Sequence, residues 1–144
     1  MNKKFIISSL VMAVASLMLG FVVHALILKG SYAQLPNLYR PEAQAQGYFG
    51  YMLLAHLLIG IGLTWIYRRG HEAGKGVLSQ GARFGAALAV VSTIPTFLIY
   101  FAVQPVPSGL VLQQIVFDSI GMLVLGVIVA WLNKSSSRFR RTRR

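Results

Sequence analysis

The chain has 144 residues, of which 56% are hydrophobic and only 12% are charged, and it contains no cysteine. A soluble domain of this length carries about a quarter charged residues, and its core is too small to bury long apolar runs. The composition therefore excludes disulfides and cysteine chemistry and favours a protein whose solvent is the lipid bilayer. The net charge is +11, with Glu42, Glu72 and Asp118 as the only acids. Most basic residues lie beside apolar segments, so we expect this charge to face a membrane surface and not a nucleic acid.

Four apolar segments are long enough to cross a bilayer, which takes about 20 helical residues. They comprise residues 5–28, 47–67, 82–104 and 110–132. The first follows Lys3 and Lys4, and Ser31-Tyr32-Ala33 has the small-residue pattern of a signal-peptide cleavage site. The apolar core of a signal peptide is only about 7–15 residues long, however, so we predict an uncleaved helix. The sequence thus predicts an all-α fold, a single polytopic four-helix transmembrane bundle in residues 1–132, followed by a basic tail in residues 133–144.

The distribution of Lys and Arg predicts the orientation, because these residues mark cytoplasmic segments. With the N-terminus inside, the cytoplasmic segments hold twelve of the 14 basic residues, and the outer loops hold only Lys29 and Arg40. We therefore expect both termini in the cytoplasm. Anionic lipid headgroups are the expected contacts of Arg83, at the start of the third helix, and of the tail. The tail arginines are Arg138, Arg140, Arg141, Arg143 and Arg144.

Each predicted helix carries small or polar residues at steps of three or four, which places them on one face. The stripes are Ser16, Gly20 and His24; His56, Gly60 and Thr64; Gly81, Gly85, Ala89, Ser92, Thr96, Tyr100 and Gln104; and Gln114, Asp118 and Gly121. Small residues let membrane helices approach closely, so we expect these faces to point into the bundle. Pro95 lies inside the third helix and removes one backbone hydrogen bond. It either kinks the helix as a hinge or is simply tolerated, as in many membrane helices.

Asp118 is the candidate functional residue, because a carboxyl group ~12 Å deep in the membrane is costly without a partner. His24, His56, Tyr100 and Gln114 fall in the same outer half, so the sequence predicts a polar cluster of these five residues. Such a cluster can bind a divalent metal, relay protons or bind a small polar ligand. It can also be structural, with hydrogen bonds that fix the helix register. The histidines lack local metal-ligand spacing, so we predict no metal site and no cofactor.

Several of these positions form a pattern across three helices. They are Gly20 and His24 near the end of the first helix, Pro95 and Tyr100 in the third, and Gln113 to Asp118 followed by Gly121 and Gly126 in the fourth. The pattern resembles small four-helix bacterial membrane proteins that are classified as domains of unknown function. Such families often have an aromatic pair where this chain has Val23-His24. The resemblance implies a multi-pass protein of the bacterial inner membrane and carries no activity with it.

Two functions remain open at this point. Short connections and the lack of a soluble domain favour a structural or interaction bundle, which binds lipid, forms a homo-oligomer or serves as an accessory subunit of a larger membrane complex. The alternative is a proton- or cation-coupled transport module that uses Asp118 and His56. An enzyme is disfavoured because the chain has few acids, no cysteine and no nucleophile–base motif.

Overall fold

The computed structural model describes residues 2–72 and 74–134, and every regular element in these ranges is helical. The first half of the chain contains α1 (Lys3–Gly20), a π-helix (Phe21–Ile27), α2 (Lys29–Ala33), α3 (Glu42–Ala45), a 3-10 turn (Gln46–Tyr48) and α4 (Phe49–Gly70). The second half contains α5 (Val77–Leu88), a second π-helix (Ala89–Thr93), α6 (Ile94–Val103) and α7 (Ser108–Asn133).

Four helical segments are long and apolar enough to cross a membrane, which confirms the predicted number of long apolar helices. They are Lys3–Ile27, Ala43–Gly70, Val77–Val103 and Ser108–Asn133. Most of their ends lie a few residues beyond the apolar runs, because a helix continues until its backbone meets a cap or a proline. At the start of α1, the Asn2 side chain caps the helix by accepting a hydrogen bond from the Lys4 backbone nitrogen at 3.0 Å. Between α6 and α7, Pro105 and Pro107 separate the two helices.

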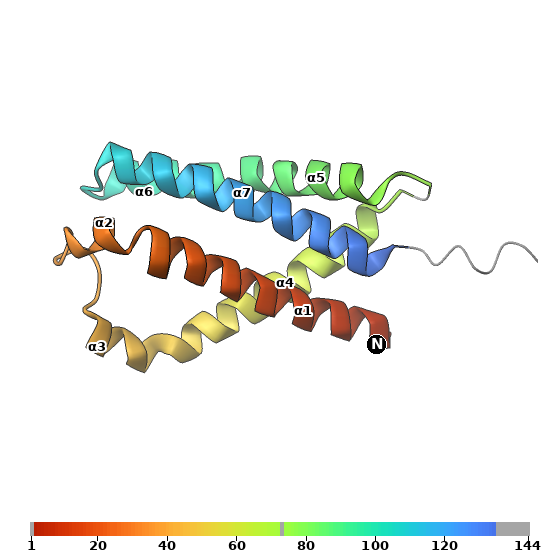
Figure 1. Cartoon of the computed structure of the whole chain (residues 1–144), viewed down its shortest axis with the longest axis horizontal. Helices are drawn as coiled ribbons and strands as arrows, with labels where there is room; N and C mark the ends of the chain where they lie inside the picture. The colour runs from red at the N-terminus through yellow and green to blue at the C-terminus, as the bar shows by residue number, and fades with distance from the viewer. Residues whose placement is uncertain (1, 73, 135–144) are drawn as a thin grey trace, which may run out of the picture.

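The long helices form two pairs (Figure 1). In one pair α1 crosses α4, and in the other the continuous α5–α6 segment runs beside α7. Contacts between α1 and α7 join the pairs. Small apolar cores lie toward the two ends of the bundle. One is centred on Met12, Leu63 and Val129, and the other on Leu28 and Val106.

Both helix pairs come together at glycines, as the small-residue stripes predicted. A Cβ atom on Gly60 of α4 would overlap the Ser9 carbonyl oxygen of α1 and lie 2.6 Å from the Ala13 nitrogen. Gly81 and Gly85 of α5 lie equally close to the backbone of α7, where Gly126 faces them. Because no side chain stands between these backbones, the helices pack at the short range that small residues permit in membrane proteins.

Pro95 stands directly after the second π-helix. A proline in a helix cannot donate to the carbonyl four residues earlier, and its ring crowds that carbonyl, so a wider turn relieves the clash. The Ser92 hydroxyl donates to the Leu88 carbonyl at 2.7 Å and satisfies one group of the disturbed turn. The extra residue in this turn shifts the inward face by one position. Thr93 is buried, whereas Ser92 is exposed.

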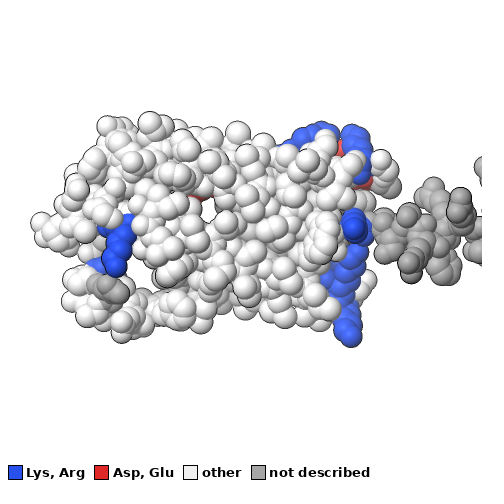
Figure 2. Space-filling model, viewed as in Figure 1, with Lys and Arg blue, Asp and Glu red and all other residues white. Residues whose placement is uncertain are grey.

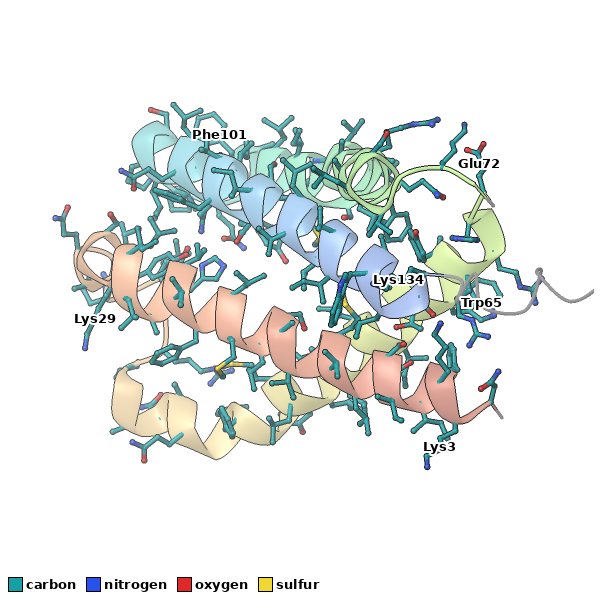
Figure 3. All side chains as sticks on the ribbon, turned by 45° about the vertical axis from the view of Figure 1, so that its right-hand side comes forward. Lys3, Lys29, Trp65, Glu72, Phe101 and Lys134 are labelled. Carbon is teal, nitrogen blue, oxygen red and sulfur yellow. The ribbon has the colours of Figure 1, made fainter. Side chains whose placement is uncertain are left out.

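The two ends of the bundle differ in charge (Figure 2). The cationic end, where α1 begins, α4 meets α5 and α7 ends, carries Lys3, Lys4, Arg68, Arg69, Lys75, Arg83 and Lys134. Figure 3 shows Lys3, Glu72 and Lys134 near this end and Lys29 at the opposite one, which we call the α2 end. The Lys4 ammonium donates to the Lys134 carbonyl oxygen at 3.0 Å, so the first and last turns of the bundle are held together.

Candidate functional site

Asp118 of α7 pairs with His24 of the first π-helix. The His24 Nε2 atom lies 3.3 Å from Asp118 Oδ1, and the two side chains are 39% and 18% exposed. His24 sits in the middle of the widened turns of residues 21–27. Single π-helical turns inside α-helices occur frequently at functional sites, because they change which side chains face a neighbour. The pairing of these two predicted residues makes this the first candidate site.

Tyr32 and Gln114 extend the pair into a chain of four side chains. The Tyr32 hydroxyl lies 2.6 Å from His24 Nδ1, and the Gln114 amide nitrogen donates to the same hydroxyl at 3.1 Å. Sequence reasoning missed Tyr32 and considered it only as part of a cleavage-site pattern. The available signal was its position about two helical turns after His24, which places it near the same helix face.

Tyr32 joins these side chains, because its hydroxyl oxygen accepts from Gln114 and lies within hydrogen-bond distance of His24 Nδ1. A hydroxyl oxygen can accept two hydrogen bonds, so the tautomer of His24 decides which partner donates in the Tyr32–His24 bond. When the imidazole carries its hydrogen on Nε2, Nδ1 accepts from Tyr32 and the Nε2 hydrogen faces Asp118 Oδ1. Among the described residues, no hydrogen bond reaches the second carboxylate oxygen of Asp118.

The phenol of Tyr32 keeps its hydrogen over the whole physiological pH range. Burial raises the pKa of Tyr32 from 10.0 to about 12, against the opposing effect of the hydrogen bond from Gln114. Repulsion from Tyr39 and Asp118 raises this pKa further. The ring of Tyr39 packs against that of Tyr32 at 4.7 Å between centroids. Tyr32 therefore keeps a hydrogen that it can donate at neutral pH.

His56 belongs to a separate hydrogen-bonded group on the α1–α4 side. Its Nδ1 atom lies 2.9 Å from the Ser16 hydroxyl, and that hydroxyl donates to the Ala13 carbonyl at 2.9 Å. Since the Ser16 hydrogen is already used, His56 Nδ1–H is the donor, and its Nε2 atom is left as an acceptor. The Nε2 edge of the imidazole lies beside Gly20, and a Cβ atom added to Gly20 would be 3.7 Å from Nε2. The sequence left open whether His56 contacts Asp118, and the structure places the two residues in separate hydrogen-bonded groups.

Tyr100 lies away from the other predicted residues. It is 47% exposed, and its ring packs edge to face against the ring of Phe97, with 6.4 Å between the two centroids. The helical spacing that placed Tyr100 inward assumed a regular α-helix. The π-helix before Pro95 adds a residue, so Phe97 faces the interior and Tyr100 is turned outward. Figure 3 shows the next residue, Phe101, pointing away from the bundle.

A large cavity separates the two helix pairs in the half of the bundle near the α2 end. Its volume is about 1240 Å³, and its wall is mainly apolar, with residues from α1, α4, α6 and α7. Figure 2 shows an opening in the white middle of the molecule with acidic atoms inside it. The polar groups on the wall include His24, His56 and Asp118, with Arg40 and Tyr48 toward the α2 end. Both hydrogen-bonded groups therefore border one open space.

A metal centre is not supported by the side chains that the structure describes. Among the side chains whose placement the structure describes, no three His, Cys, Asp or Glu residues lie close enough to hold an ion. His24 and Asp118 supply two ligand atoms, and His56 belongs to the other group. Zinc and related ions generally need three or four protein ligands. The arrangement thus suits binding and proton transfer better than metal coordination.

The predicted lipid-contact residues lie at the cationic end or beyond the described residues. Arg83 is 67% exposed, and its Nη1 atom lies 3.9 Å from Glu72. Glu72 also pairs with Lys75, and the hydrogen bond and charge of Lys75, followed by Arg83, lower the pKa of Glu72. The Gln80 side chain binds the backbone of this loop at residues 72 and 75. The tail arginines, Arg138, Arg140, Arg141, Arg143 and Arg144, fall outside the described residues.

Comparison of the chain with protein-family models, with curated proteins and with solved structures finds no match. The resemblance to four-helix bacterial membrane proteins therefore stays a prediction from the sequence.

Proposed function

We propose that this chain is a multi-pass integral membrane protein of a bacterial inner membrane, with its cationic end in the cytoplasm. Four long apolar helices support the insertion. The positive-inside rule supports the orientation, because seven Lys and Arg residues of the described ranges lie at the cationic end and only Lys29 and Arg40 lie at the other. The apolar outer surface is then available to lipid or to helices of a larger membrane complex.

We further propose that the protein is a binding module and not an enzyme, and that it holds an apolar or amphiphilic molecule between its helix pairs. The cavity of about 1240 Å³ is the observation that carries this proposal. Pockets for drug-sized ligands span about 300–1,000 Å³ and combine apolar walls with a few polar groups. The wall here has that composition, and its polar groups border the cavity at His24, His56 and Asp118. Such a module can act alone, as a homo-oligomer or as an accessory subunit.

A pair of glycine variants tests the proposal. Gly121 lines the cavity and has open space beside its Cβ position, so Gly121→Leu narrows the cavity near Asp118 without a backbone clash. Gly62 of α4 also has open space but does not line the cavity, so Gly62→Leu is the matched control. The probe is N-phenyl-1-naphthylamine, a neutral apolar fluorophore, added to protein in uncharged detergent. We expect equal saturable fluorescence with wild type and Gly62→Leu and weaker binding by Gly121→Leu. Equal signals from all three proteins would reject the proposal.

The hydrogen-bonded chain favours a second function, proton-coupled transport. An imidazole between a phenol and a carboxylate can pass a hydrogen from one ring nitrogen to the other, which is how histidine relays protons. His24 has these two neighbours at 2.6 and 3.3 Å. If transport occurs, wild-type protein in liposomes will carry a pH-driven proton flux that His24→Gln abolishes and Ser92→Ala does not. Equal flux in empty liposomes would exclude this function.

A further inference from the structure

The cavity has an uneven distribution of charge. Asp118 is the only acidic side chain among the described residues of its wall, and Arg40 is the only Lys or Arg. The Arg40 guanidinium lies 4.0 Å from the ring centroid of Tyr48, at the α2 end, and this ring already engages its charge. The two histidines on the wall already have partners, since His24 contacts Asp118 and His56 contacts Ser16. Among the described residues of the wall, Asp118 therefore has no Lys or Arg as an ion-pair partner.

Asp118 has capacity for a further partner. Its side chain is 18% exposed, and Oδ1 lies 3.3 Å from His24 Nε2. No hydrogen bond within the described residues reaches the other oxygen, and the carboxylate borders the cavity. A carboxylate in apolar surroundings is costly unless it is well paired, and the contact with His24 engages only one of its two oxygens. The second oxygen can therefore take a cationic partner from the cavity.

Aromatic rings surround the same space. Phe21, Tyr39, Phe49 and Phe97 line the cavity, and they come from both helix pairs and from the segment before α3. The faces of aromatic rings attract cations, and cages of such rings are a common way to bind quaternary ammonium groups. Apolar contacts from the remaining wall would bury the body of a ligand whose charge lies near Asp118.

We propose that the cavity binds an organic cation with an apolar body, such as a lipophilic ammonium or phosphonium compound, with Asp118 as its counter-ion. This inference rests on the proposed binding function and adds the charge and chemical class of the ligand. His56 Nε2 and the free Asp118 oxygen are both acceptors, so the site also suits an ammonium group that donates hydrogen bonds. An anionic ligand would instead meet the carboxylate at close range and be repelled.

A pair of probes with the same shape and opposite charge tests the inference. Tetraphenylphosphonium and tetraphenylborate differ mainly in sign, and both are offered to the full-length protein in an uncharged detergent, with binding measured at equilibrium. We expect wild-type protein to bind the phosphonium at least tenfold more tightly than the borate. The selectivity of the wild type requires no variant, so the test does not depend on whether a substituted chain folds.

Two variants then separate charge from space. Asp118→Asn keeps the shape of the side chain, so it should weaken phosphonium binding at least tenfold and remove the preference for phosphonium over borate. Gly121→Leu should weaken the binding of both ions, and Gly62→Leu should weaken neither. If phosphonium and borate bind wild-type protein equally and Gly121→Leu weakens both, the cation inference is wrong and the binding function stands. If wild-type protein binds none of the three probes, both proposals are wrong.

Discussion

Substituting Gly126 tests whether backbone contact between α5 and α7 holds the bundle together. In Gly126→Ala the new methyl group would overlap the Gly81 carbonyl oxygen and lie 2.8 Å from the Gly85 nitrogen, whereas ordinary contact begins at 3.4 Å. All of these neighbours are backbone atoms, so no side chain can rotate away. The contact with the Gly85 nitrogen alone requires the helices to separate by roughly 0.6 Å, and the overlap with the Gly81 oxygen requires more. Overpacking of this kind costs about 1–3 kcal/mol.

Gly121→Ala is the matched control, because it changes the same helix five residues earlier. A Cβ atom at Gly121 meets nothing within 4 Å. Both variants gain the helix propensity of alanine over glycine, ~1 kcal/mol, so this gain cancels when they are compared. We expect Gly126→Ala to have a free energy of unfolding ~1–3 kcal/mol below that of Gly121→Ala. The measurement is reversible unfolding in mixed micelles, followed by circular dichroism. Equal stabilities would refute the close approach of α5 to α7.

Two further predictions concern pH. Because burial raises the pKa of Tyr32 to about 12, the absorbance of tyrosinate at 295 nm in wild type minus Tyr32→Phe should rise near pH 12 and not near pH 10. The neutral phenol then contributes stability in full below pH 10 and loses it as the pH approaches 12. For Glu72 the folded pKa lies below the ordinary 4.5, so its stabilising effect is present above pH 4.5 and is lost as the pH falls through the lowered value. Thermal unfolding of Glu72→Gln should therefore match wild type in acid and fall below it at neutral pH, by a small amount because the pair is exposed. A difference that persists unchanged into strong acid would contradict this assignment.

The helices and their close contacts could be predicted from the sequence. Long apolar runs specify helices because the backbone must satisfy its own hydrogen bonds wherever water is absent. The packing faces that contain Gly60, Gly81 and Gly85 could be predicted for a similar reason. Residues at steps of four lie on the same face of a helix, whichever helix packs against it. These contacts were predicted correctly because they depend only on the period of a regular α-helix.

The structure brings some of the predicted site residues together and separates others. His24, Gln114 and Asp118 belong to one connected group of side chains. His56 was predicted at nearly the depth of Asp118 but bonds to Ser16 of α1, because depth along a helix does not say which neighbour a side chain faces. Tyr100 is turned outward because the second π-helix changes the period before it. Tyr32 joins the chain from a short helix outside the apolar runs, where hydropathy carries no signal.

The sequence by itself determined the number of long apolar helices and the small-residue faces through which they pack, because these follow from local composition and helical period. Only the tertiary structure decided how His24 reaches Asp118, why His56 stays with Ser16, and that the two helix pairs leave a cavity between them. Those features depend on the crossing of helices far apart in the chain and on the two π-helical turns. Pro95 signals a disturbed turn in the third helix but does not specify its geometry, and neither the helix crossing nor the first π-helix changes the local pattern of apolar and polar residues.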